Sequence, residues 1–383
     1  MTIKLYDKDA YLKSFKAKVK SCELSGDAYE VILDKTAFFP EEGGQCADKG
    51  TLGGILVSDV KLKGDTVYHY VDKPLNIGEE VTGEIDWDVR YRNMQNHTGE
   101  HILSGLAHNL FGFENVGFHL GADEVTMDIS GVLSDEQIDF LEHEANKIIL
   151  QNKDIVCYYP KQNELLNLEY RSKLDLTENV RIVNIKDVDF CACCAPHVKS
   201  TAEVGVIKIS YRMNWKGGMR FFIKCGFDAY KEYCSLKSNA VRISALLSAK
   251  QECISESVEK LKYENEMLKN EKARLENELV AIKIKNLSPS DKPFVMCFKN
   301  IGTDALREAV NLGMEKFPLF IGLLGKEKPF RYIIGSKEKD LGAIIKNINA
   351  DLNGRGGGRG EMVQGSFDMP LEEIVSYFER SKF

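Results

Sequence analysis

Two histidines four residues apart, His97 and His101, are the side chains whose types and spacing first suggest chemistry. An apolar run follows them, and at this spacing both imidazoles would project from one face of a helix. Far downstream, Cys193 and His197 are again four residues apart. Imidazole nitrogens and thiolates are the ligands that zinc prefers in tetrahedral sites. We therefore predict that His97, His101, Cys193 and His197 bind one zinc ion, Zn2+.

The ligand set leaves two features of this zinc site open. Cys191 and Cys194 flank Cys193 and are competing ligands. With four protein ligands the site would be closed, as structural zinc sites are. If one ligand is labile or the coordination expands, the metal can bind water or a substrate group and take part in catalysis.

Glu100 suggests a different reaction for the helical half of the site. Together with the two histidines it satisfies the H-x-x-E-H pattern of inverted zinc peptidases, in which the glutamate is the general base. Such peptidases complete the site with a downstream carboxylate, whereas the downstream cluster here supplies a thiol and an imidazole. A zinc metallopeptidase is therefore an alternative hypothesis.

Length and composition are typical of a multidomain globular protein. The chain has 383 residues, 43% hydrophobic and 28% charged, which predicts two or three folded domains. A net charge of −7 argues against a surface that coats nucleic acid everywhere, but it permits local basic patches.

Signals for targeting are absent from the sequence. No run of about 18 apolar residues predicts a membrane span, and the first residues lack the pattern of a secretory signal. The ten cysteines are scattered apart from the cluster at 191–194, so reduced thiols and a metal site are expected rather than disulfides. We expect a cytoplasmic protein without membrane contact.

The elements that would position these residues predict an α+β fold with four domains. Residues 1–90 contain short strands punctuated by Asp, Gly and Pro, typical of a small β-barrel. Residues 91–227 mix helix and strand and contain both halves of the zinc site, the cysteine–histidine cluster lying between two strands. Residues 228–287 are expected to form a long coiled-coil helix, and residues 288–383 a C-terminal α/β domain with a glycine-rich segment.

The segment 228–287 has leucine or isoleucine at every seventh position from Leu247 to Ile282. This heptad pattern predicts a coiled coil that pairs two chains into a homodimer. Asn265 and Lys272 at the other core position would restrict register and favour two strands. An amphipathic helix that packs on its own domain is the alternative.

The glycine-rich segment, residues 354–366, could expose backbone N–H groups beside Arg355 and Arg359. Such a combination can cradle phosphate, although a mobile surface loop is the alternative. The segment lacks the GxxxxGK[ST] pattern of nucleotide-hydrolysing enzymes.

Four motifs in this order resemble the alanyl-tRNA editing (AlaX) family and the editing half of alanyl-tRNA synthetase. The family's T-x-F-Y-P-E-G-G-G-Q loop is similar to residues 36–45, where Phe39 replaces tyrosine and Glu42 replaces the first glycine. Its H-x-x-x-H-L-L-S helix resembles residues 97–104, and a strand that lines its site resembles residues 118–121.

The remaining motifs extend the resemblance over almost the whole chain. The family's C-G-G-T-H-V cluster is similar to residues 193–198, which keep the ligands but lack both glycines and the threonine. In the long members a coiled coil leads to a G-G-G-x-x-x-M-A-Q-G domain, which residues 356–365 resemble. The same module occurs in phosphoesterases of the DHH type.

The resemblance implies hydrolysis of the ester that joins a wrong amino acid, serine or glycine, to alanine tRNA. Nothing in the sequence resembles an aminoacylation domain, so we expect editing in trans. The alternative to an enzyme is a non-catalytic tRNA-binding protein with a structural zinc. The residues expected to take part in catalysis are Thr36, Gln45, Glu100 and His119. Those expected to contact the substrate are Phe39, Gly43, Gly44, Arg355, Gly357, Gly358, Arg359 and Gln364.

Overall fold

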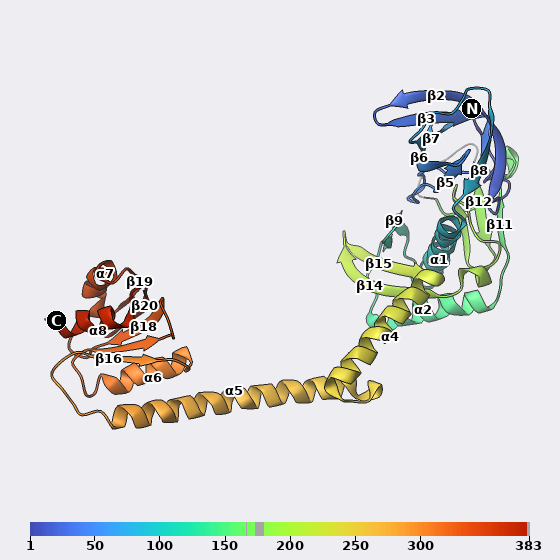
Figure 1. The fold of residues 1–383 in the computed structure, drawn as a ribbon. Helices are drawn as coiled ribbons and strands as arrows, with labels where there is room; N and C mark the ends of the chain where they lie inside the picture. The colour runs from blue at the N-terminus through green and yellow to red at the C-terminus, as the bar shows by residue number, and fades with distance from the viewer. Residues whose placement is uncertain (166, 173–179, 381–383) are drawn as a thin grey trace. The chain divides into compact units, whose positions relative to one another are not determined.

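The computed structural model describes residues 1–165, 167–172 and 180–380 (Figure 1). It combines helices and strands as the α+β prediction requires. The chain divides into two units, residues 1–239 and 240–383, and each is described by itself.

A closed six-stranded barrel begins the first unit and confirms the predicted barrel. In barrel order its strands are β2 (Ser14–Ser25), β3 (Ala28–Leu33), β7 (Thr66–Val71), β6 (Ile55–Lys63), β5 (Gly50–Leu52) and β8 (Glu80–Ile85). Alternate side chains fill the interior, as the period of two in a strand requires. A short parallel pair, β1 (Ile3–Lys4) and β4 (Lys35–Thr36), leads into the loop that carries the glycine pair.

The long helix α1 (Trp87–Phe111) follows the barrel and contains the histidine pair. It begins four residues before the predicted domain boundary at residue 91, because the Asp86 side chain caps the helix by accepting a hydrogen bond from the Val89 N–H. Gly112 ends it with a left-handed φ of 70°. Most residues from Arg90 to Ala107 are buried, polar ones included, so α1 is a central helix of this unit.

Two antiparallel sheets complete the first unit around α1. The four-stranded sheet has the order β14 (Ile207–Trp215), β15 (Gly218–Cys225), β10 (Val125–Ile129) and β9 (Asn115–Leu120). The three-stranded sheet has the order β11 (Ile155–Tyr158), β12 (Ile182–Ile185) and β13 (Asp189–Ala192). Helix α2 (Asp135–Leu150) begins at a capping box formed by Ser134 and Gln137. Two short helices, α3 (Gln162–Leu165) and the 3-10 turn η1 (Thr201–Val204), lie in the connections.

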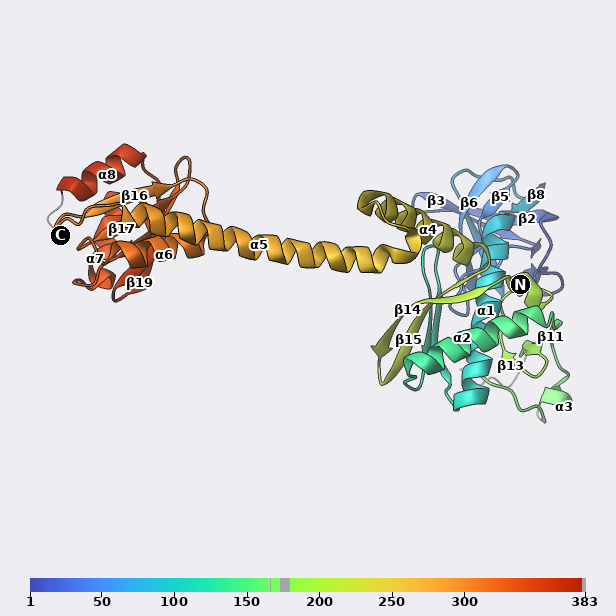
Figure 2. The same ribbon diagram turned by 90° about the horizontal axis from the view of Figure 1, so that it is seen from below.

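The predicted continuous helix over 228–287 is interrupted. Helix α4 (Phe227–Leu247) ends where Ser248 adopts a left-handed φ of 51°, and the 3-10 turn η2 (Gln251–Cys253) precedes α5 (Ile254–Lys285). The C-terminal end of α5 lies beside α6 (Thr303–Gly313) in Figure 2. The buried residues of α5, Val280 and Ile284, pack there in one hydrophobic cluster with residues of α6.

The second unit contains a five-stranded sheet with the order β16 (Phe294–Phe298), β17 (Phe320–Leu324), β18 (Phe330–Gly335), β20 (Met362–Phe367) and β19 (Gly354–Arg359). Helices α6, α7 (Leu341–Asp351) and α8 (Leu371–Arg380) accompany it. The glycine-rich segment is the edge strand β19, paired in register with β20, rather than a loop. No helix in the described part of the chain is long and apolar enough to cross a membrane.

Candidate metal centre

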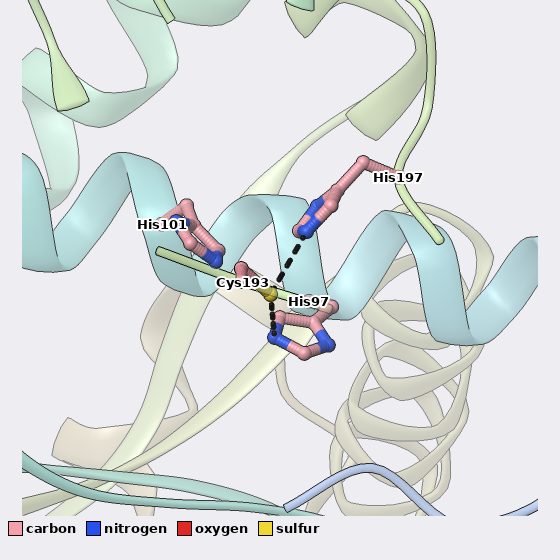
Figure 3. A group of neighbouring side chains, drawn as sticks. All are labelled: His97, His101, Cys193 and His197. Atoms are coloured by element: carbon pink, nitrogen blue, oxygen red, sulfur yellow. Dashed lines mark hydrogen bonds between the residues drawn. The ribbon is translucent and has the colours of Figure 1, made fainter. Parts of the chain in front are cut away.

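The four predicted ligands, distant in the sequence, lie together in the first unit (Figure 3). His97 and His101 project from one face of α1, and Cys193 and His197 come from the loop after β13. The Cys193 Sγ lies 3.5 Å from His97 Nε2 and 3.4 Å from His197 Nε2, and the ligand atoms of all four residues lie within 4.8 Å of one another. Ligand atoms at about 2.0–2.3 Å from a tetrahedral zinc ion are spaced like this, so the donor set fits the metal.

Each of the three imidazoles makes a hydrogen bond through Nδ1 to a residue outside the group. The pairs are His97 with Gln45 Oε1 at 2.8 Å, His101 with Asp189 Oδ2 at 2.7 Å and His197 with Thr98 Oγ1 at 3.0 Å. A bound Nδ1–H leaves the Nε2 lone pair for the metal, and partners of this kind orient metal-binding histidines.

Electrostatics favour the metal-binding forms of two ligands. Burial alone would raise the pKa of the Cys193 thiol, but the charge of His97 and hydrogen bonds from His101 and His197 hold that pKa well below its usual range. Burial lowers the pKa of His197 to about 3, so its imidazole is neutral at neutral pH. A thiolate and a neutral imidazole are what zinc binds.

A cavity of about 600 Å³ opens beside the metal group. Its walls include His101 and Cys193 from the metal group, Gly43 and Gly44 from the first motif, and Phe118 from β9. Cys194 lines the cavity as well, while Cys193 is the thiol that groups with all three histidines. Cys191 belongs to a separate grouping with His101 and Asp189.

The first motif divides between the centre and the protein interior. Gln45 is fully buried and holds His97, and the glycine pair lines the cavity. Thr36 lies behind them, with its hydroxyl 2.8 Å from His69 Nε2, and it does not line the cavity. Phe39 is fully buried and packs edge-to-face on Tyr6, with ring centroids 5.3 Å apart.

The two remaining predicted catalytic residues differ in position. Glu100 lines the cavity, and its carboxylate accepts a hydrogen bond from the Asn115 amide. His119 is exposed on β9. Its neighbour Phe118 packs on the His97 ring, with centroids 4.6 Å apart, so His119 points to the opposite face of the sheet. The catalytic roles of Thr36, Gln45, Glu100 and His119 stay predictions.

Sequence reasoning missed two arginines that organise the centre. Arg171 donates to Asp189 Oδ1 from Nε at 2.9 Å and from Nη2 at 2.6 Å, and it also reaches the Ser104 hydroxyl. Arg181 donates to the carbonyls of Cys193 and Ala195 at 3.0 and 2.7 Å, which fixes a loop without the family's glycines. Neither arginine belongs to a spaced motif, so no sequence signal identified them.

The predicted tRNA contacts of the second unit lie on the β19–β20 hairpin. Arg355, Gly357, Gly358 and Arg359 are exposed on β19. Gln364 is exposed on β20, where its side chain accepts a hydrogen bond from Arg307 at 2.9 Å. Their contact with tRNA stays a prediction.

Comparisons with known proteins identify the family. The model described as "tRNA synthetases class II (A)" matches residues 6–89. The model "Threonyl and Alanyl tRNA synthetase second additional domain" matches residues 180–223, which include Cys193 and His197. The alanyl-tRNA editing protein AlaX-L of Pyrococcus horikoshii is 30% identical over 99% of this chain and 100% of its own length. The chain belongs to the alanyl-tRNA editing protein family.

Two other relatives differ from this chain in length. AlaX-M of Saccharolobus solfataricus is 35% identical, and the match covers 58% of this chain but 98% of the relative. The alanine–tRNA ligase of Pyrococcus abyssi is 30% identical over 94% of this chain, which spans only 41% of that enzyme.

Proposed function

We propose that this chain edits in trans, hydrolysing the ester between serine or glycine and alanine tRNA. As a member of the alanyl-tRNA editing family it is an aminoacyl-tRNA deacylase. The observation that carries the proposal is the metal group in the wall of the cavity of about 600 Å³. This volume is in the range of small-molecule sites, and it suits a terminal nucleoside that carries a small amino acid.

The residues of this chain would prepare the centre for hydrolysis. His97, His101, Cys193 and His197 would hold the zinc. When bound, zinc polarises a carbonyl or acidifies a water molecule. Glu100 would accept a proton within the cavity, since its carboxylate lies in the wall and the Asn115 amide fixes its orientation.

A second, hydrolytic site is needed because serine, glycine and alanine differ too little in binding free energy for a single binding step to separate them. A missing methyl group or an added hydroxyl changes binding by only about 1–3 kcal/mol. We propose that the glycine pair of the first motif limits the size of the amino acid that enters, because both glycines line the cavity.

We further propose that the chain is a cytoplasmic homodimer that holds the tRNA body through the β19–β20 hairpin. The heptad side chains Leu261, Leu268, Leu275 and Ile282 are 52%, 68%, 50% and 59% exposed, which suits a second helix. A Leu268→Lys substitution should convert the dimer to a monomer in light scattering, while Lys269→Glu on the same helix should not.

Deacylation of seryl-tRNA by the zinc-loaded protein tests the proposed function. A His97→Ala variant should hydrolyse seryl-tRNA at least about 100-fold more slowly. The substitution removes one metal ligand together with its hydrogen bond to Gln45. A His143→Ala variant, which changes an exposed histidine of α2, should retain activity. Peptide cleavage without deacylation would instead favour a metallopeptidase, and tRNA binding without either reaction would favour a structural zinc.

A further inference from the structure

We propose that Glu42 binds the α-ammonium group of the aminoacyl ester and so restricts the cavity to esters of amino acids with a free amino group. This inference rests on the proposed function, because it assigns a substrate contact within the same cavity. Glu42 is the residue that replaces the first glycine of the family's loop.

The backbone holds Glu42 in a fixed position at the cavity wall. The Glu42 N–H donates to the Gln45 carbonyl at 3.2 Å, and the Gln45 N–H donates back at 3.0 Å. Gly43 and Gly44, between them, have φ of 62° and 81°, which favour glycine. The turn is joined to β9 because the Leu120 N–H donates to the Gly44 carbonyl at 2.7 Å.

Among the residues that the structure describes, the charges around the cavity leave Glu42 without a partner. The carboxylates of the described chain that line the cavity are Glu42, Glu100 and Glu114. Glu100 accepts from the Asn115 amide, and Glu114 Oε1 lies 2.8 Å from His108 Nδ1. Within the described part of the chain, the Glu42 side chain makes no hydrogen bond or ion pair.

The two arginines that line the cavity already bind other groups. Arg171 binds Asp189, and Arg181 binds backbone carbonyls of the metal loop. Lys4 also lines the cavity but forms no ion pair with Glu42, among the side chains that the structure describes. An unpaired, half-buried carboxylate in a partly enclosed site attracts a cation.

The chemistry of the substrate supplies one such cation. An aminoacyl ester carries a protonated α-amino group below a pH of about 7.7, whereas the rest of the tRNA end is neutral or anionic. A charged hydrogen bond between this ammonium and Glu42 would place the ester relative to the metal group. An N-acylated or deaminated ester could not form it.

Two substrates that differ only in the amino group test this inference at pH 6.5. The substrates are seryl-tRNA and 3-hydroxypropionyl-tRNA, in which hydrogen replaces the ammonium. Glu42→Gln should slow hydrolysis of seryl-tRNA by roughly 10–100-fold, the range expected for a lost charged hydrogen bond. The same substitution should change the rate of 3-hydroxypropionyl-tRNA hydrolysis by less than about threefold, because that ester has no ammonium group for Glu42 to bind.

The matched control is Glu114→Gln, which neutralises another carboxylate of the cavity and should slow both substrates equally or neither. The thermal stability and zinc content of Glu42→Gln should equal those of the wild type, since the amide is isosteric. Equal slowing of both substrates by Glu42→Gln, or no slowing, would overturn the inference. The proposed function itself fails only if the wild type does not hydrolyse seryl-tRNA, which is a separate outcome.

Discussion

The hydrogen bonds behind the metal ligands matter because each fixes the proton on one imidazole. Asp189 is fully enclosed and binds His101 Nδ1 at 2.7 Å, while Arg171 neutralises its other oxygen. Asp189→Asn should weaken zinc binding by roughly 10–100-fold, the usual effect of losing such a partner. Competition with a coloured chelator measures this affinity directly.

Asp187→Asn is the matched control for that measurement. Asp187 lies two residues away, is 72% exposed and has a left-handed φ of 61° that asparagine tolerates. The zinc affinity of the Asp187→Asn variant should stay at the wild-type value. If Asp189→Asn also binds zinc normally, the carboxylate does not set the tautomer of His101.

His69 should make the stability of the first unit depend on pH. Burial in the barrel lowers the pKa of His69 to about 4, against an ordinary value of 6.5. Between pH 6.5 and 4 the unfolded chain therefore binds a proton that the folded chain does not, so stability falls as the pH falls. The loss for this group should reach about 3 kcal/mol at pH 4.

Urea unfolding of the wild type and of His69→Gln between pH 7 and 4 measures this contribution. Both tryptophans, Trp87 and Trp215, lie in the first unit, so their fluorescence reports that unit alone. The wild type should lose about 3 kcal/mol more than the variant over this range. Parallel pH curves for the two proteins would contradict the assignment.

At the scale of elements, the turn of residues 42–45, which is hydrogen-bonded to β9, positions Gln45. A Cβ atom on Gly44 would lie 2.5 Å from the Phe118 carbonyl oxygen. Gly44→Ala should therefore displace the turn and the Gln45 side chain, and deacylation should fall by about 10-fold or more. Gly54→Ala, with a similar φ of 80° and nothing within 4 Å of the added atom, is the matched control.

The comparison of the two glycine variants separates the effect of backbone strain on stability from the effect of a displaced Gln45 side chain on activity. Each should cost roughly 1–2 kcal/mol in stability, because alanine is strained at a left-handed φ. Only Gly44→Ala should lose activity, measured as kcat/KM on seryl-tRNA. Equal activity in both variants would show that the turn does not need its contact with Phe118.

Elements with a local sequence pattern were predictable, and so was the meeting of the two ligand pairs, but the contacts behind the ligands were not. The spacing of His97 and His101 indicated one helical face, and the Asp, Gly and Pro residues between short segments indicated the barrel strands. Asp189 and Arg171 carry no such signal, because only the folded chain brings them to His101 and to each other. The glycine-rich segment left a phosphate cradle and a mobile loop open as predictions, whereas pairing with β20 makes it a strand.

The break after α4 shows a further limit of the sequence pattern. The heptads continue through Ser248, so periodicity predicted one helix, but the backbone leaves the helical region at this residue. The Ser244 hydroxyl donates to the Ala249 carbonyl at 2.5 Å, a local alternative to helical bonding. Hydrophobic spacing describes which residues share a face and does not detect such competition.

At the scale of the whole molecule, the two units should have separable contributions. The metal group and the cavity lie entirely in residues 1–239, and the arginine-bearing hairpin lies in the second unit. A chain of residues 1–250 should keep its kcat on seryl-tRNA but show a KM raised about 10-fold, with a weaker dependence on salt. Unchanged KM and salt dependence would show that the second unit does not bind tRNA.

Arg90 has a consequence for how the first unit melts. Its guanidinium is fully buried, forms an ion pair with Asp48 and donates to the carbonyls of Ala10 and Ala37 at 2.9 and 2.6 Å. Opening the barrel while α1 stays folded would break the ion pair and both hydrogen bonds together. The barrel and the histidine helix should therefore give a single calorimetric peak, and neither could be exchanged between relatives without the other.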